Sequence, residues 1–386
     1  MNTPIRPNII ISTYDDLDNP YYAGGGARAV HEVARRLVDD YNVTVLTGDF
    51  PGATEEMARD GVRYIRIGSS SIGSKLGQLV FTALLPYYAK RMNYDLWIES
   101  FTPPFSISAL PLVSDKPVIG LVHMLSAQDM ERKYKLPFRY IENAGLKWYR
   151  SFITLSPGVQ KKIHAINPNA IIERIPNGVN LPVPSPSTKP CNYFLFMGRI
   201  EVDQKGLDLL LGAYALVKDK INHPLLIVGD GHKKDILKLK TTINDLKLTK
   251  QVKLIGRVGG VEKDRLFRES LAVVCSSRFE TYPLTALEAM SYKKCLISFN
   301  IEGVGWIPRD SQIKVPCFNT HDLAKRLLSV SKRPATAAHI GTRAFEFVKH
   351  HSWDSTAAKY RSFIMETLRG AQTTSSIWQF NTRKST

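Results

Sequence analysis

Two glutamates, Glu280 and Glu288, stand with seven residues between them, shortly after the strand-like run Leu271–Cys275. Pro283 lies between them, and proline suits the first position of a helix because its missing N–H costs nothing there. Glu288 would then lie roughly one turn into the helix, where its carboxylate can accept both hydroxyls of a ribose. Glu280, in the preceding loop, can accept the hydroxyls of another ring. Because two neighbouring carboxylates need such donors, the pair indicates a hydroxyl-rich ligand.

The start of this helix and a second charged segment both suit phosphate. A helix N-terminus presents free amides and a positive dipole end to an anion. The amides expected to do so are those of Tyr282, Leu284 and Thr285. In Met197–Gly206 the chain leaves a strand-like run and enters a helix, a position where open α/β sheets bind ligands. The cations of Arg199 and Lys205 suit a diphosphate there. The alternative for this segment is a solvated strand-to-helix loop.

The remaining reactive side chains give weaker signals. His123 ends the strand-like run Val118–Val122, where a lone histidine is more often structural than functional. No Asp-x-Asp motif lies in a convincing strand-end loop. The cysteines are scattered without metal-ligand spacing, which favours free thiols in a reducing cytosol. They are Cys191, Cys275, Cys295 and Cys317.

The elements that must position these residues alternate regularly along the chain, with short β-branched runs separated by helical patterns. In the first half the runs are Asn8–Ile11, Val43–Leu46, Tyr64–Ile67, Leu96–Glu99, Val118–His123, Phe152–Leu155 and Ile171–Ile175. In the second half they are Tyr193–Met197, Leu225–Val228, Val252–Ile255, Leu271–Cys275, Cys295–Ser298 and Ile313–Val315. This alternation predicts an α/β fold with parallel sheets covered by helices on both faces. The first helix is expected directly after Gly24–Gly26.

The chain of 386 residues is long enough for two hydrophobic cores. The Pro-rich segment Leu181–Pro190 interrupts the alternation, because proline removes donors and fixes φ. We therefore expect an N-terminal domain over residues 1–185 and a C-terminal domain over residues 190–355. A helix over 356–370 is expected to pack back on the N-terminal domain, ahead of a loose polar tail over 371–386.

The net charge of +17 is unevenly distributed. The first 189 residues hold 21 basic and 17 acidic side chains, a balance of +4, and the others hold 31 and 18, a balance of +13. Seven lysines and two acids in Lys233–Lys253 favour a solvated helix face over a polyanion site, so we expect no nucleic-acid partner. Met130–Arg150 interleaves basic and aromatic side chains, a mixture compatible with an anionic membrane surface.

The sequence also bears on the compartment. No apolar run reaches the ~18–20 residues of a membrane span. The first residues lack the pattern of a signal peptide, so we expect a cytoplasmic protein. Peripheral contact with the inner face of a membrane is compatible with this expectation.

Several motifs occur together in a fixed order. The glutamates stand in S-R-F-E-T-Y-P-L-T-A-L-E-A-M, and Arg199 and Lys205 stand in G-R-I-E-V-D-Q-K-G. Further motifs are I-P-N-G-V-N at Ile175–Asn180, I-V-G-D-G at Ile227–Gly231 and L-I-G-R-V at Leu254–Val258. In these motifs, and in their spacing over most of residues 8–370, the chain resembles the retaining glycosyltransferase family 4, of the GT-B fold. The resemblance implies two Rossmann-like domains that face each other across a cleft.

The resemblance also implies a role for each matching residue. Arg199 and Lys205 would clamp the donor diphosphate, Glu288 would bind the ribose and Glu280 the hydroxyls of the donor sugar. His123 matches the family's histidine beside the transferred sugar. The other residues expected at the donor are Gly24, Gly25, Gly26, Arg257, Val258, Thr281, Tyr282, Leu284 and Thr285. The glycines would permit close approach to the phosphates, and the backbone at 257–258 would meet the nucleobase.

The implied activity is the retaining transfer of a hexose-type sugar from a UDP-, GDP- or ADP-sugar. No metal and no cofactor are expected, because cationic side chains would stabilise the leaving diphosphate. Neither glutamate is expected to act as a nucleophile, since the leaving phosphate helps to deprotonate the acceptor hydroxyl. The acceptor is a glycan, a lipid-linked sugar or a small molecule. Its recognition is expected in Ser74–Tyr94, Phe101–Phe105 and Met130–Arg150.

Two alternatives stay open. One is a GT-B protein that binds sugar nucleotides or polyanions without catalysis, and the other is a sugar-nucleotide epimerase, which needs no acceptor. One segment departs from the family pattern: Ser298–Pro308 keeps glycines and one acid, but in an altered order. This departure concerns the contacts with the donor sugar and not the fold.

Overall fold

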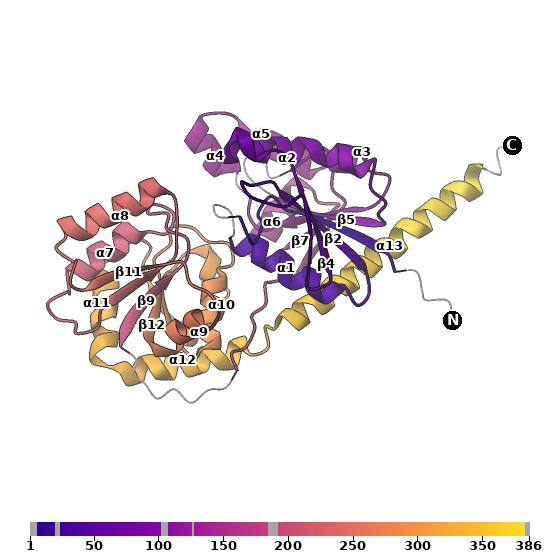
Figure 1. Cartoon of the computed structure of the whole chain (residues 1–386). Helices are drawn as coiled ribbons and strands as arrows, with labels where there is room; N and C mark the ends of the chain where they lie inside the picture. Colours follow the sequence, from indigo (N-terminus) through magenta and orange to yellow (C-terminus); the bar gives the residue numbers. More distant parts are fainter. Residues whose placement is uncertain (1–5, 20–23, 102–106, 126, 184–191, 383–386) are drawn as a thin grey trace. The chain divides into compact units, whose positions relative to one another are not determined.

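The computed structural model describes residues 6–19, 24–101, 107–125, 127–183 and 192–382. The chain forms two compact units (Figure 1). The first unit combines Met1–Asn177 with Trp353–Thr386, and the second comprises Gly178–Ser352. Each unit has its own sheet, and the two are described in turn.

The first unit is built on an eight-stranded sheet. Its strands are β1 (Asn8–Ser12), β2 (Asn42–Gly48), β3 (Glu56–Arg59), β4 (Val62–Ile67), β5 (Leu96–Ser100), β6 (Val118–Val122), β7 (Ser151–Thr154) and β8 (Ile171–Arg174). The order is β3-β4-β2-β1-β5-β6-β7-β8, and every pair is parallel except the antiparallel β3 and β4. The chain starts at β1, moves outward to β3 and β4, and returns to β5 on the other side of β1.

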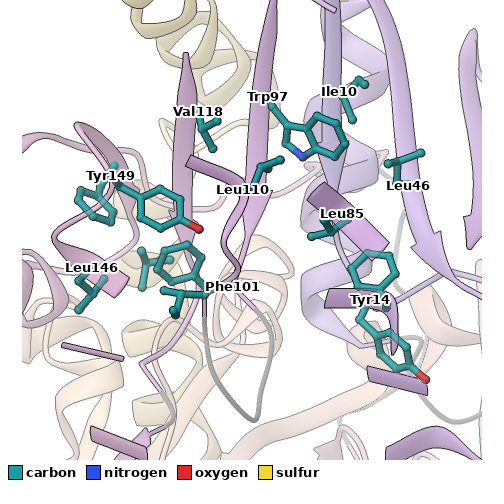
Figure 2. Close-up of a cluster of buried hydrophobic side chains, with 14 of the residues drawn as sticks. Ile10, Tyr14, Leu46, Leu85, Trp97, Phe101, Leu110, Val118, Leu146 and Tyr149 are labelled. Atoms are coloured by element: carbon teal, nitrogen blue, oxygen red, sulfur yellow. The ribbon is translucent and has the colours of Figure 1, made fainter. Parts of the chain in front are cut away.

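Helices cover this sheet. They are α1 (Gly25–Leu37), α2 (Ser74–Ala89), α3 (Leu110–Val113), α4 (Ala127–Tyr134), α5 (Phe138–Leu146), α6 (Pro157–Ile166) and α13 (Trp353–Thr382). A hydrophobic cluster joins strand residues such as Trp97 to helix residues such as Leu85 and Leu146 (Figure 2). Trp97 is fully buried, and its indole N–H donates to the Ser12 hydroxyl at 2.9 Å. The apolar side chains of the strand runs thus form a core with the helices, as the alternation predicts.

Helix α13 packs against α1 although more than 300 residues separate the two in the chain. Its buried side chains Ala357, Tyr360 and Ile364 repeat at helical spacing. Arg361 donates to the Asp40 carboxylate, just after α1, and its guanidinium also donates to the Arg36 carbonyl in the last turn of α1. The C-terminal helix therefore belongs to the first unit.

The second unit contains a six-stranded sheet in which every pair is parallel. Its strands are β9 (Tyr193–Met197), β10 (Leu225–Val228), β11 (Val252–Gly256), β12 (Ser270–Cys275), β13 (Cys295–Phe299) and β14 (Ile313–Val315). The order β11-β10-β9-β12-β13-β14 is that of a Rossmann fold. Its helices are α7 (Leu207–Ala215), α8 (Lys233–Asp245), α9 (Gly260–Glu269), α10 (Leu284–Ser291), α11 (Thr320–Lys332) and α12 (Pro334–Val348).

The predicted fold class, two α/β domains with parallel sheets, is confirmed. Several details differ from the expectations. The chain enters the second unit at Gly178, before the Pro-rich segment, because Val179 pairs with Ser352 in a short parallel bridge. Residues 184–191 of that segment lie outside the described residues. Helix α13 continues to Thr382, so the expected loose tail is helical over most of its length. None of the described helices is long and apolar enough to cross a membrane.

Candidate active site

The predicted diphosphate and sugar residues of the second unit meet where its strand order reverses. The chain begins at β9, moves outward to β10 and β11, and returns to β12 on the other side of β9. The loops after β9 and β12 therefore start from the carboxyl ends of neighbouring strands and run in opposite directions. Open α/β sheets bind ligands at this position, which is called the topological switch point. Arg199 and Lys205 lie in the first loop, and Glu280 lies in the second.

Close backbone packing holds these two loops together. Gly206 has a left-handed conformation, with φ of 58°, and a Cβ placed on it would lie 2.1 Å from the carbonyl oxygen of Ser276. The Ser276 hydroxyl donates to the Lys205 carbonyl at 2.8 Å, and the Arg278 amide donates to the Gln204 carbonyl at 2.8 Å. Only glycine fits at 206, because any side chain would push the loops apart.

Lys205 and Glu280 form an ion pair across this junction. The Lys205 Nζ lies 2.6 Å from the Glu280 Oε1, and the two side chains are only 17% and 13% exposed. The Ser277 hydroxyl, which the sequence did not single out, donates to the same carboxylate oxygen at 2.7 Å. The carboxylate and the ammonium are therefore oriented by charge-assisted hydrogen bonds before any ligand arrives.

Arg278 adds a further link that sequence reasoning missed. Its guanidinium makes two hydrogen bonds to the Asp208 carboxylate, at 2.8 and 2.7 Å, and one to the Asp203 carbonyl at 2.6 Å. Partial burial acts to raise the pKa of Asp208, but the hydrogen bonds and charge of Arg278 lower it overall. This pair fastens the loop after β12 to the first turn of α7.

Arg199 contacts residues of its own loop, whereas Lys205 contacts Glu280. Its side chain is 48% exposed, and its guanidinium lies 3.2 Å from the Glu201 carboxylate and 3.5 Å from the Gln204 side-chain oxygen. Of the two predicted phosphate cations, Lys205 is therefore the one that the fold holds in place.

The segment after β13, where the sequence departs from the family pattern, supports the Glu280 loop from behind. A Cβ on Gly303 would lie 2.0 Å from the Glu280 carbonyl oxygen, so these backbones touch. Trp306 stacks on Tyr282, with ring centroids 4.2 Å apart and an interplanar angle of 17°. The altered glycines and the tryptophan thus form a rigid support for the loop that carries Glu280.

The start of α10 differs slightly from the prediction. Pro283 is the N-cap, with extended backbone, and the helix begins at Leu284. The Thr285 hydroxyl donates to the Met197 carbonyl at 3.1 Å, which ties the helix start to the end of β9. Tyr282 is buried, whereas Thr281 and Leu284 are partly exposed. The helix N-terminus thus lies beside the carboxyl end of the strand that leads to Arg199 and Lys205.

The predicted nucleoside residues lie along β11, α9 and α10. Arg257 and Val258 follow β11 and precede α9, and Arg257 is exposed. Glu288 lies on α10 and pairs with Lys263 of α9, whose Nζ is 2.6 Å from the Glu288 Oε1. Lys263 is the second cation that sequence reasoning missed at this site.

The remaining predicted residues belong to the first unit, where Gly24–Gly26 follow β1 and His123 follows β6. Gly24 is the N-cap of α1, and a Cβ on Gly24 or Gly26 would lie 3.4 Å from the Asp15 carboxylate. Burial lowers the pKa of His123 to about 4, so that its imidazole is neutral at pH 7, and its Nε2 is buried with no hydrogen-bond partner among the described residues. Residues 102–106 of the expected acceptor loop lie outside the described residues.

Two family models match adjoining parts of the chain. The model "Glycosyltransferase Family 4" matches residues 23–182, and the model "Glycosyl transferases group 1" matches residues 182–347. The sequence is 29% identical over 164 residues to the poly(ribitol-phosphate) alpha-N-acetylglucosaminyltransferase of Staphylococcus aureus, a match of 41% of this chain and 32% of that protein. The chain spans less than a third of the length of the curated relatives that it matches.

Solved structures are similar over nearly the whole chain. Sucrose-phosphate synthase from Thermosynechococcus elongatus gives a TM-score of 0.79 at 19% identity, with 95% of this chain and 100% of that one covered. The Anabaena protein HepE, solved in complex with UDP-glucose, gives a TM-score of 0.73 at 16% identity, with 94% and 100% covered. From the two adjoining family matches and this shared fold, the chain belongs to the GT-B glycosyltransferases, with a family 4 N-terminal half and a group 1 C-terminal half.

Proposed function

We propose that this chain transfers a hexose-type sugar, with retention and without a metal, from a nucleotide-sugar donor to an acceptor hydroxyl. The observation that carries the proposal is the Lys205–Glu280 pair at the switch point between β9 and β12. It places a cation, an oriented carboxylate and the start of α10 around one position. A diphosphate bearing a sugar needs these three groups, because it offers charged oxygens at one end and hydroxyls at the other.

The pair suggests how a donor would be held. Lys205 and Glu280 neutralise each other in the arrangement described above. A diphosphate that attracts Lys205 would release a Glu280 oxygen to accept hydroxyls of the sugar. As the bond between the anomeric carbon and the diphosphate breaks, negative charge grows on the phosphate oxygen, and Lys205 with Arg199 would stabilise it. The leaving phosphate would then accept the proton of the acceptor hydroxyl on the same face.

The donor nucleotide is the first property to establish. The similarity to a protein solved with UDP-glucose supports testing UDP and UDP-sugars first, with GDP and ADP conjugates alongside. Specific binding of any of them raises the melting temperature of the protein. The acceptor class, a glycan, a lipid-linked sugar or a small molecule, then follows from screening acceptors with the donor that binds.

Removal of the cations tests the catalytic part of the proposal. Lys205→Met and Arg199→Met are each expected to lower kcat/KM for release of the nucleoside diphosphate by about 10²–10³-fold, the loss typical of one preorganised charge-stabilising group. Lys253→Met, at an exposed position on β11 of the same unit, is the matched control and should leave kcat/KM unchanged. Normal turnover in both site variants would refute the assignment.

The same assay separates the alternatives. Binding of a sugar nucleotide without turnover, with every acceptor tried, would indicate a non-catalytic binding protein. An isomerised sugar nucleotide formed without an acceptor would indicate an epimerase. Turnover that persists in a chelator such as EDTA is expected from the metal-independent mechanism.

We also propose that α5 and the residues around it contact an anionic membrane. The apolar side chains of Leu136, Tyr140, Ile141 and Trp148 are 57%, 77%, 45% and 38% exposed. Exposed basic side chains stand among them, namely Lys135, Arg139, Lys147 and Arg150. Exposed aromatics beside cations are typical of an interfacial segment, and such a contact would serve a lipid-linked acceptor.

Sedimentation with liposomes tests this contact. The protein is expected to bind vesicles that contain an acidic phospholipid, to bind neutral vesicles weakly, and to dissociate as salt increases. Lys147→Gln combined with Arg150→Gln should weaken binding about tenfold or more, from ~1 kcal/mol for each charge. The exposed lysines Lys233 and Lys234 of α8, changed to glutamine, give a control of equal charge. Equal loss in both double variants would mean that net charge, and not this segment, drives binding.

A further inference from the structure

A second lysine–glutamate pair accompanies the first in the second unit. The Lys263 Nζ lies 2.6 Å from the Glu288 Oε1, and the two side chains are 20% and 15% exposed. Glu288 is the residue expected to bind the ribose of the donor. Lys263 is a residue to which neither the sequence motifs nor the family resemblance gives a role.

The surrounding contacts hold Lys263 in place. On α9, Leu266 and Phe267 are buried one turn further along, so Lys263 lies on the inward side of the helix rather than on its solvated face. The Phe267 ring stacks on Tyr292, with centroids 5.1 Å apart and an interplanar angle of 8°. The Tyr292 hydroxyl donates to the carboxylate of Asp264. Helix α9 is therefore fastened to the C-terminal end of α10, one turn beyond Glu288.

This arrangement determines which part of Glu288 is left for a ligand. The ammonium group occupies Oε1, and the ion pair restricts the torsions of a glutamate side chain that would otherwise be free to rotate. The other carboxylate oxygen, Oε2, keeps its lone pairs for further donors. Without the lysine, a mostly buried carboxylate would lack its counter-charge and would turn toward water.

We propose that Lys263 is a positioning residue for ribose recognition, which holds Glu288 so that its second oxygen accepts the 2′- and 3′-hydroxyls of the donor nucleoside. This inference rests on the proposed function. Its consequence is selectivity: the protein distinguishes a ribonucleotide from a 2′-deoxyribonucleotide through Lys263, although Lys263 itself contacts Glu288 and not the sugar.

Binding measurements with matched ligands test this role. Isothermal titration is carried out with UDP, GDP and ADP, with their 2′-deoxy counterparts and with inorganic pyrophosphate. The wild type is expected to prefer the ribonucleotide by about 10–100-fold, the value of hydrogen bonds to a charged group. Lys263→Met should reduce this preference to less than about threefold while the affinity for pyrophosphate stays the same.

Further variants separate positioning from folding. Lys263→Arg keeps a donor and a charge, and it should restore most of the preference. Glu288→Gln should lose the same preference, and the double variant Lys263→Met with Glu288→Gln, which leaves no unpaired buried charge, should lose no more than either single change. Lys253→Met is the control on the same unit and should behave as the wild type.

Four results would overturn the inference. Full ribose preference in Lys263→Met would leave Lys263 without a role there. Equally weakened binding of pyrophosphate and nucleotides would make Lys263 a phosphate ligand. A wild type that binds pyrophosphate and nucleotides without any ribose preference would remove the role of Glu288 as well. A wild type that binds none of these ligands would overturn the proposed function and this inference together.

Discussion

Two buried titratable side chains in the first unit oppose each other in their dependence on pH. Glu99, at the end of β5, accepts hydrogen bonds from the Tyr149 hydroxyl at 2.7 Å and the Ser108 hydroxyl at 3.0 Å. Burial nevertheless raises the pKa of Glu99 to about 7. Burial of His123, after β6, lowers its pKa to about 4. At neutral pH the histidine is uncharged, and the glutamate is close to its midpoint.

The signs of the two contributions follow from these shifts. Because the pKa of Glu99 is raised from 4.5 to about 7 in the folded protein, the stability that it contributes is complete below pH 4.5 and is lost as pH rises through 7. Because the pKa of His123 is lowered from 6.5 to about 4, its contribution is complete above pH 6.5 and is lost as pH falls through 4. Between pH 4.5 and pH 6.5 the two contributions to stability therefore change in opposite directions and nearly cancel.

Single substitutions should reveal the pH dependence of each contribution to the free energy of unfolding. The free energy of unfolding of Glu99→Gln minus that of the wild type is expected to rise by about 3 kcal/mol between pH 4.5 and 7, from 1.36 kcal/mol per pKa unit. The same difference for His123→Gln should fall by a similar amount between pH 4 and 6.5. Urea unfolding at a series of pH values measures both. If neither difference in the free energy of unfolding changed with pH, the shifted pKa values of Glu99 and His123 would be contradicted.

At the same scale, the residues of the candidate site divide into those that spacing predicts and those that it does not. Lys205 and Glu280 lie in the loops that follow two strand-like runs, and the carboxyl ends of parallel strands meet at one edge of the sheet. Lys263 could be found only through its position, since a lysine four residues before Phe267 lies on an apolar helix face. Trp306 gave no signal, because its stacking on Tyr282 joins segments that no local pattern relates.

The strands of the sheets were largely predictable as elements, with one exception. β3 is short and carries charged side chains, so its hydrophobic pattern is weak. The stronger signal was the turn: Asp60 and Gly61 both have positive φ, of 51° and 78°, and they join β3 to β4 as an antiparallel hairpin. Asp-Gly is the pair that a two-residue hairpin turn favours, so the turn chemistry could have predicted the strand that periodicity missed.

Element boundaries were harder to predict than the elements themselves. Proline suits the first position of a helix, but Pro283 is the N-cap of α10, and the helix start is bonded through Thr285 to β9, which lies far away in the sequence. Helix α13 extends beyond the expected end because no proline follows Gly370 and the residues after it are compatible with a helix. Polar composition alone suggested a loose tail, and composition says little about helix length.

At the scale of the whole molecule, the two-domain organisation followed from length and alternation, but the path of the chain did not. The first unit is discontinuous, since it takes its last helix from residues 353 onward. The chain passes between the units twice, after Asn177 and after Ser352. The two segments are paired within the second unit, where the Val179 amide donates to the His351 carbonyl at 2.8 Å. A pairing between residues so far apart in the chain leaves no trace in a local pattern, so the boundary was expected at the prolines instead.

This discontinuity leads to a prediction about stability. If α13 completes the core of the first unit, Ile364→Ala should lower the free energy of unfolding of that unit by about 2–5 kcal/mol, because Ile364 is fully buried and its removal leaves a cavity. Met365→Ala is the matched control: the next residue on the same helix is 44% exposed, and its loss should cost about 0.5 kcal/mol or less. Urea unfolding of the full chain, followed by hydrogen exchange of amides in β1 and β5, reports on the first unit specifically. Equal and small effects of the two substitutions would mean that α13 adds little to the core, whereas the expected difference would show that the end of the chain is needed to stabilise its beginning.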